Sequence, residues 1–136
     1  MTDAPRPTVA IAAIVFDADD RVLLVRRGRP PGEGLWTVPG GKLESGETLT
    51  AGVEREVREE TGLDVTCGAL VAVVERLGAG WHYVILDYLA ELRGGTLRAA
   101  DDVTDARWFS RADLDALTCT EGLAPVIDLA FASRRR

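Results

Sequence analysis

Three glutamates that lie close together, Glu56, Glu59 and Glu60, have the residue type and the spacing for metal or acid–base chemistry. They belong to the segment 48–61, in which apolar residues recur at the spacing of one helix face. An advance of about 100° per residue puts Glu60 inside the apolar stripe, with Glu56 and Glu59 at its edge. Because burial of an unpaired charge is costly, we expect these carboxylates to be paired, protonated or bound to a cation.

The alternative for a run of charges on a helix is a solvated face. It fits part of the segment, since the same count directs Glu54, Arg55 and Arg58 toward solvent. It does not fit the three inward glutamates, which outnumber the nearby arginines and leave net negative charge. Gly52 lies one turn before Glu56 on the same strip, where we expect it to leave room for a ligand.

The carboxylate oxygens of the glutamates are hard ligands, and the segment has no His or Cys. This donor set suits Mg²⁺ or Mn²⁺ rather than zinc. Divalent ions that bridge a pyrophosphate would neutralise its charge and lower the pKa of a bound water. One carboxylate could then orient or deprotonate that water. The residues therefore indicate a metal-assisted hydrolase of a phosphate compound.

The elements that position the glutamates are predicted to form one sheet with helices on both sides. Apolar segments rich in β-branched and aromatic residues predict strands at 9–16, 21–27, 65–76, 81–92 and 105–109, the first two as a hairpin. Helical signals predict a helix at 48–61, a helical turn at 111–117 and a terminal helix at about 121–132. Since strands and helices do not alternate regularly, the order favours an α/β (α+β) fold over a doubly wound one.

Length and composition predict one soluble globular domain over residues 1–136. The chain is 46% hydrophobic and 28% charged, as globular proteins are. Its net charge of −6 and pI of about 4.8 exclude the basic surface that long nucleic acids require. A polyanionic substrate would therefore need accompanying cations.

Cys67 and Cys119 lack the paired spacing of a zinc or redox site, which favours a reducing compartment. The N-terminal residues MTDAPRPT lack the apolar core of a signal peptide, and no apolar run reaches membrane-spanning length. We therefore expect a cytoplasmic protein without membrane association. Its apolar strands could support a homodimer, and the sequence leaves the oligomeric state open.

The segment 41–63 resembles the full signature of the Nudix hydrolases, G-x5-E-x7-R-E-U-x-E-E-x-G-U with U aliphatic. Gly41 and Glu47 occupy its first two fixed positions, and the run REVREETGL at 55–63 matches the remainder. The resemblance covers about 8–132, which we expect to be the core of the domain. It implies the Nudix fold, an α/β/α sandwich around a mixed β-sheet, and hydrolysis of a nucleoside diphosphate linked to another group.

The resemblance also implies roles for residues of the signature. Metal ligands would be the three glutamates and a main-chain carbonyl of the glycine pair: Glu56, Glu59, Glu60, and Gly40 or Gly41. Catalytic roles fall to Glu56, Arg55 and Glu59. Glu56 matches the general base of some members, whereas others place the base on a distant loop, and Arg55 matches the arginine that orients a catalytic glutamate. Glu47 matches a structural position near the helix start, where negative charge is favoured.

Outside the signature, three residues are candidates for substrate binding: Arg27, Tyr83 and Asp102. Arg27 ends a predicted strand where related triphosphatases place a substrate arginine, although arginines at strand ends are mostly solvated. Asp102, with Asp101, is either an additional acid or a turn pair. Tyr83 could form a stacking wall or pack an edge. His82, the one histidine, is not expected to be a ligand or a catalyst.

The substrate is predicted from one further difference. ADP-ribose hydrolases of the family tend to carry a proline beyond the signature, and this chain has Gly78-Ala79-Gly80 there. This difference favours a nucleoside triphosphate pyrophosphatase of the house-cleaning type. An ADP-ribose or nucleotide-sugar pyrophosphatase is the alternative. From other classes, a non-catalytic nucleotide-sensing domain and a protein-interaction helix remain, and the inward glutamates count against both.

Overall fold

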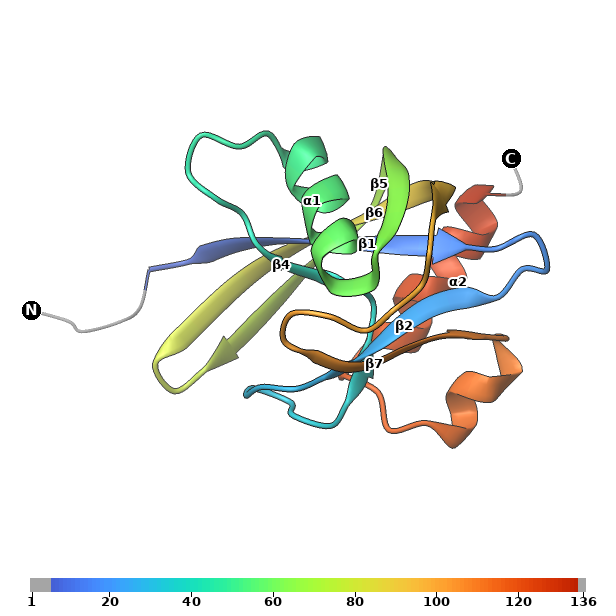
Figure 1. The fold of residues 1–136 in the computed structure, drawn as a ribbon. Coiled ribbons are helices and arrows are strands. Elements are labelled where there is room, and N and C mark those ends of the chain that lie inside the picture. The colour runs from blue at the N-terminus through green and yellow to red at the C-terminus, as the bar shows by residue number, and fades with distance from the viewer. Residues whose placement is uncertain (1–5, 135–136) are drawn as a thin grey trace, which may run out of the picture.

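The computed structural model describes residues 6–134 and has a mixed seven-stranded sheet at its centre. The strands follow the order β3-β2-β1-β6-β5, with β4 paired to β1 and β7 paired to β2. Helix α1 covers one face of the sheet and α2 covers the other (Figure 1). The predicted α/β/α arrangement is therefore confirmed. The elements are β1 Thr8–Phe16, β2 Val22–Arg27, β3 Trp36–Thr37, β4 Gly40–Lys42, α1 Leu49–Thr61, β5 Leu63–Gly78, β6 Trp81–Gly95, β7 Val103–Phe109, the 3-10 helix η1 Ala112–Ala116 and α2 Leu123–Arg134.

Strand β1 is the apolar centre of the sheet and runs parallel to β6. Its odd-numbered residues from 11 to 15 pack in the core beneath α1, and its even-numbered residues from 12 to 16 pack beneath α2. Both faces are thus removed from water, which explains the nearly continuous apolar run in this part of the sequence. The two cores together hold the sheet between the helices.

Strands β1 and β2 form the predicted hairpin but soon diverge. They pair at Phe16 and Val22, after which β4 takes the place beside β1, with Gly41 opposite Ile11. Strand β2 instead pairs with β3 and β7. The sequence did not predict β4, because its residues have little intrinsic preference for strands. The divergence opens the sheet at the end where β4 meets α1.

Helix α1 begins and ends with recognisable caps. The Thr48 side chain accepts a hydrogen bond from the Ala51 N–H, so Thr48 caps the helix instead of forming its first turn. Gly62 has the left-handed φ of 74° and donates its N–H to the Arg58 carbonyl. Val53 and Val57 are fully buried against the sheet, as the helix count predicted. This packing fixes the rotation of α1 and so the direction of its glutamates.

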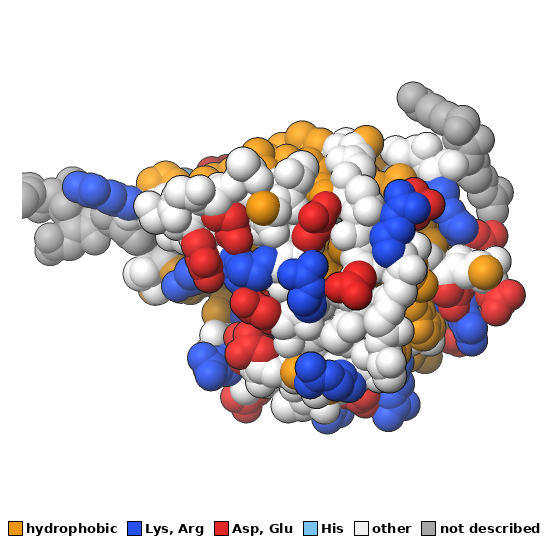
Figure 2. Space-filling model, turned by 45° about the horizontal axis from the view of Figure 1, so that its top comes forward, with side chains coloured by type: hydrophobic (Ala, Val, Ile, Leu, Met, Phe, Trp, Pro, Cys, Tyr) orange, Lys and Arg blue, Asp and Glu red, His pale blue; other side chains and the backbone are white. Residues whose placement is uncertain are grey.

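The remaining predicted elements are confirmed with shifted ends. Strands β5 and β6 each extend past the predicted bounds, and α2 begins at Leu123 because Gly122 has a φ of 78° that is incompatible with the helix. None of the helices within residues 6–134 is both long and apolar enough to cross a membrane. On the face that carries α1, acidic and basic side chains are interspersed (Figure 2).

Candidate active site

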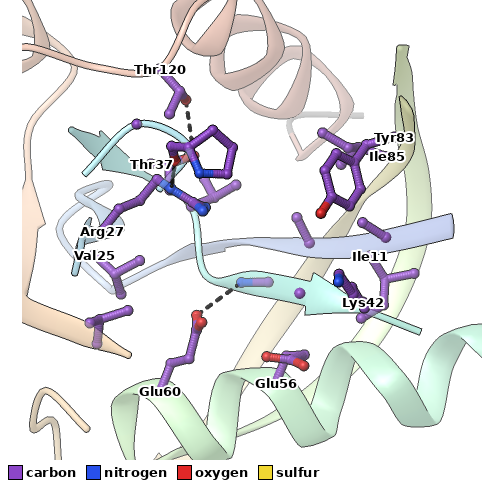
Figure 3. Close-up of a pocket in the computed structure, with 18 of the residues that line it drawn as sticks. Ile11, Val25, Arg27, Thr37, Lys42, Glu56, Glu60, Tyr83, Ile85 and Thr120 are labelled. Carbon is purple, nitrogen blue, oxygen red and sulfur yellow. Dashed lines mark hydrogen bonds between the residues drawn. The ribbon is translucent and has the colours of Figure 1, made fainter. Parts of the chain in front are cut away.

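A cavity of about 790 Å³ opens where β1 and β2 diverge. It is bounded by α1, β4, the loop 28–32, the strands β5 and β6 and the segment that leads into α2. Glu56 and Glu60 approach it from α1, while Thr37, Thr120, Tyr83 and Ile85 lie on the other side of β4 (Figure 3). The volume is in the range of small-molecule sites and suits a nucleotide.

Arg55 is the centre of an ion-pair network at the edge of this cavity. Its Nε and Nη2 donate to the two carboxylate oxygens of Glu47 at 2.6 and 2.9 Å. Its Nη1 donates to Glu56 Oε1 at 2.8 Å and to Glu59 Oε2 at 3.2 Å. The side chain is only 19% exposed, so the prediction that Arg55 faces solvent was wrong. The helix count gives the direction of Cβ, and the long side chain turns back along the helix from there.

Two further expectations about the helix are corrected. Gly52 does not make room for a ligand, because a Cβ there would lie 2.9 Å from Glu47 Oε1 and 3.0 Å from Leu43 Cδ1. The glycine instead lets Glu47 reach Arg55, whose hydrogen bond holds the pKa of Glu47 below its usual range. Glu54 is not simply solvated either, since it accepts the Cys67 N–H at 2.9 Å and so ties α1 to β5.

Glu56 and Glu60 are buried carboxylates, 8% and 5% exposed. The pKa of Glu60 is raised to about 9, mainly by burial. The Gly40 N–H, which donates to Glu60 Oε1 at 3.0 Å, lowers this pKa, whereas the charges of Glu56 and Asp102 raise it. Burial also raises the pKa of Glu56, and Arg55 opposes that shift. The pair therefore lacks the positive charge that would hold both carboxylates ionised.

The glycine pair of β4 lets the backbone contact both β1 and α1. A Cβ on Gly41 would lie 2.6 Å from Glu56 Oε1, and a Cβ on Gly40 would collide with the Ile11 carbonyl. Only glycine fits against the backbone at position 40, and a larger residue at position 41 would displace either β4 or the Glu56 side chain. The main chain of β4 thus lies against the carboxylates that the sequence associated with it.

The chemistry of the donors fits a hard divalent cation. Glu56, Glu60 and Asp102 supply only carboxylate oxygens, and their mutual repulsion raises the pKa of Glu60. Within residues 6–134, no three acidic, His or Cys side chains already converge as a metal site. Glu59 is 46% exposed and bonded to Arg55. The predicted metal ligands are therefore neighbours, and coordination by all three glutamates would require side-chain rotation.

The three substrate-binding candidates, Arg27, Tyr83 and Asp102, all line the cavity. Arg27 Nε donates to the Pro31 carbonyl at 2.6 Å, which ties the strand end to the loop 28–32. The Asp102 carbonyl accepts the Gly28 N–H at 2.9 Å and brings a second loop to the same rim. His82 lies outside the lining, with Nε2 2.8 Å from Glu75 Oε2.

The charged residues of the cavity that sequence reasoning missed include Asp87 on β6 and Arg76 on β5. Sequence reasoning also missed the hydroxyl pair in which Thr120 donates to Thr37 at 3.0 Å. Asp87 did leave a signal, because it is the one charged residue in the apolar run YVILDYLA. A carboxylate at the centre of a buried strand requires a partner or a ligand.

The model of the NUDIX domain matches residues 6–130 of the chain. The chain belongs to the NUDIX domain family. The family predicted from the segment 41–63 is therefore confirmed.

Relatives from this family share about a third of their residues with the chain. An ADP-ribose pyrophosphatase from Methanocaldococcus jannaschii is 35% identical over 114 residues, which cover 82% of this chain and 66% of the relative. An 8-oxo-dGDP phosphatase from Homo sapiens is 30% identical, covering 93% of this chain and 39% of the relative. This NUDIX chain thus spans less than two thirds of each of these proteins.

A solved NUDIX structure matches the fold over nearly its whole length. The MutT NUDIX hydrolase from Burkholderia pseudomallei superposes with a TM-score of 0.82 at 31% identity, covering 91% of this chain and 98% of that one.

Proposed function

We propose that this NUDIX chain is a Mg²⁺-dependent hydrolase, with Mn²⁺ as the alternative ion, that cleaves the pyrophosphate linkage of a nucleoside diphosphate derivative. The carrying observation is the pair Glu56 and Glu60, two buried carboxylates short of positive charge in a cavity of nucleotide size. Two or more bound divalent cations would offset the negative charge of the pair and of the pyrophosphate that they bridge.

The residues of the site would bind the cation, accept a proton and position the carboxylates. Glu56, Glu59 and Glu60, with a main-chain carbonyl of Gly40 or Gly41, would hold the cation, which when bound supplies positive charge at the phosphates and lowers the pKa of water. Arg55 holds Glu56 by Oε1, which leaves Oε2 to accept a proton from an attacking water. Through Glu47 and Glu59, the same arginine fixes the carboxylates relative to one another.

For the substrate, we infer a nucleoside triphosphate, as in a house-cleaning pyrophosphatase. The chain lacks the downstream proline associated with ADP-ribose hydrolysis, and Arg27 and Asp102 on the cavity rim would contact the phosphates and their ions. The second candidate is an ADP-ribose or nucleotide-sugar pyrophosphatase, which the name of the archaeal relative favours. A non-catalytic nucleotide-sensing domain is the third.

We also propose that the protein works in a reducing compartment such as the cytoplasm. Cys67 and Cys119 are both free and half-buried, and burial raises the pKa of each thiol. Thiols in this state resist oxidation and metal binding, which suits a structural role.

The test is a panel of nucleoside triphosphates, ADP-ribose and nucleotide sugars with Mg²⁺, with every product identified. Glu60→Gln keeps the shape of the side chain and removes its charge, so we expect at least about a 100-fold loss of kcat. Glu91→Gln, at an exposed carboxylate outside the cavity, is the matched control and should keep full activity. Activity of Glu60→Gln near the control would refute the metal role. If no compound of the panel released a product, the hydrolase proposal would fail and the non-catalytic nucleotide-sensing domain would be favoured.

A further inference from the structure

The cavity continues on the face of the sheet that α2 covers, away from the glutamates of α1. Tyr83, Ile85 and Asp87 alternate along β6 and all line it. Asp87 aligns with Ala12 of β1, which belongs to the core beneath α2. Figure 3 shows Tyr83 and Ile85 across β4 from the α1 carboxylates. This second half of the cavity has no role in the phosphate chemistry proposed above.

Asp87 is the buried charged group of this half. It is 5% exposed, and burial raises its pKa to about 6, an effect that the charge of Arg76 partly offsets. No hydrogen bond within the described chain contributes to holding its charged form. Within residues 6–134, every fully buried side-chain oxygen or nitrogen atom has a hydrogen-bond partner. The Asp87 oxygens, which have no such partner, are therefore not fully enclosed and face the cavity. A buried acceptor in this state is costly unless a ligand supplies donors.

The residues paired directly with Asp87 have small side chains. In the sheet it lies between Ala12 of β1 and Ala72 of β5, two residues with the smallest side chains that carry a Cβ. Paired residues project from the same face, so the two side chains directly beside the carboxylate are methyl groups. A planar ligand can therefore approach both oxygens.

Two aromatic rings lie farther along the same face of β6, toward the hairpin end, and Tyr83 is the nearer of the two to Asp87. Trp81 and Tyr83 lie with their ring centroids 5.8 Å apart, and both line the cavity. The Trp81 ring lies directly against Gly78, where any Cβ would collide with it, so the hairpin end is shaped to hold this ring. Aromatic side chains of this kind stack on the heteroaromatic ring of any base, because every base has a π-face.

We propose that Asp87, Tyr83 and Arg76 form a base subsite, in which Asp87 accepts hydrogen bonds from a ring N–H and an adjacent amino group, the edge that guanine presents. This inference rests on the proposed function, since it assigns the base of the same nucleotide. A carboxylate has two acceptor oxygens and matches two adjacent donors. The corresponding edge of adenine has a ring nitrogen that accepts, and its lone pair would face a carboxylate oxygen.

GTP and ITP form the matched substrate pair, because they differ only in the amino group. For the unmodified protein we expect kcat/KM to favour GTP by at least about tenfold, since ITP leaves one Asp87 oxygen without a donor. Asp87→Asn should reduce this ratio to below about threefold. Glu75→Gln removes an exposed carboxylate on β5 outside the cavity and should leave the ratio unchanged. A ratio is unaffected by a general loss of folded enzyme.

Binding of the uncharged nucleosides separates this inference from the proposed hydrolysis. Titration calorimetry with guanosine and inosine, without metal, should show the same preference and the same dependence on Asp87. If guanosine is preferred through Asp87 but no nucleotide is cleaved, the base subsite stands and the proposed function fails. If nucleotides are cleaved but the unmodified protein treats GTP and ITP alike, the base subsite is wrong and the function stands. An unchanged ratio in Asp87→Asn also overturns it.

Discussion

At the scale of single residues, Arg55 gives two buried carboxylates different electrostatic states. Its Nη1 lies 2.8 Å from Glu56 Oε1, whereas Glu60 accepts the Gly40 N–H at 3.0 Å. Burial raises the pKa of both, and the guanidinium opposes that shift at Glu56 alone. We infer that Glu56 is the better proton acceptor near neutral pH, while Glu60 depends on a cation to ionise.

Glu60 should make the metal-free protein less stable as the pH rises. Its pKa is raised from the ordinary value of 4.5 to about 9, so the folded state binds this proton more tightly than the unfolded state. The resulting stabilisation is fully present below about pH 4.5 and is lost as the pH rises through about 9. Glu60→Gln, which does not titrate, should have a free energy of unfolding at least about 1 kcal/mol higher at about pH 8.

Urea denaturation in the presence of a chelator, at several pH values between about 5 and 9, measures this difference. Glu91→Gln serves again as the exposed control and should retain the slope of the unmodified protein. If Glu60→Gln retained that slope as well, the proton of Glu60 would not be linked to folding.

The orientation of residues was only partly predictable from the sequence. The helix count placed Glu60 on the buried side because the direction of Cβ follows from helix geometry. It failed for Arg55, since a long side chain can reach several directions and its choice depends on Glu47, which lies outside the helix. Asp87 could have been noticed as a lone charge in an apolar strand, but its place in the cavity follows from strand pairing alone.

At the scale of elements, α1 was predictable because its signals are local. Thr48 at the N-cap, the Val53 and Val57 spacing and Gly62 at the C-cap all lie within the segment itself. Strand β4 has no such local signal, since its residues form a strand only by pairing with β1. The site depends on this short strand as much as on the helix, because its glycines allow the carboxylates and the backbone to meet.

Gly41→Ala tests that dependence of the site on β4. The new Cβ would lie 2.6 Å from Glu56 Oε1 and 2.7 Å from its Cδ, so either β4 or the Glu56 side chain must move. We expect kcat to fall by at least about tenfold, because small displacements of catalytic groups are costly. The measurement is steady-state hydrolysis with the best substrate of the panel, together with thermal unfolding.

Gly94→Ala is the matched control for this substitution. It adds the same methyl group to β6, where nothing lies within 4 Å of the new Cβ. Its kcat and melting temperature should stay close to those of the unmodified protein. Equal losses in the two variants would show that the effect arises from glycine replacement in strands generally and not from contact with Glu56.

At the scale of the whole molecule, the sheet separates two kinds of chemistry. The carboxylates of α1 border one part of the cavity, and the base subsite lies on the opposite face, beneath α2. The chain also carries a net charge of −6, which disfavours the approach of any polyanion. The phosphates of a nucleotide therefore require cations, whereas its base meets the ring of Tyr83 and a carboxylate that needs hydrogen-bond donors.

This separation predicts that metal acts on one part of the ligand only. Affinity for GTP should fall by at least about tenfold when Mg²⁺ is removed by a chelator, because phosphates and carboxylates of like charge are then brought together. Affinity for guanosine, which has no phosphate, should stay the same with or without Mg²⁺. Titration calorimetry on the unmodified protein, with guanosine and with a GTP analogue that cannot be hydrolysed, gives both values. If removal of Mg²⁺ weakened the binding of guanosine as much as the binding of GTP, the two halves of the cavity would not be independent. The cation would then organise the whole cavity instead of the phosphate side alone.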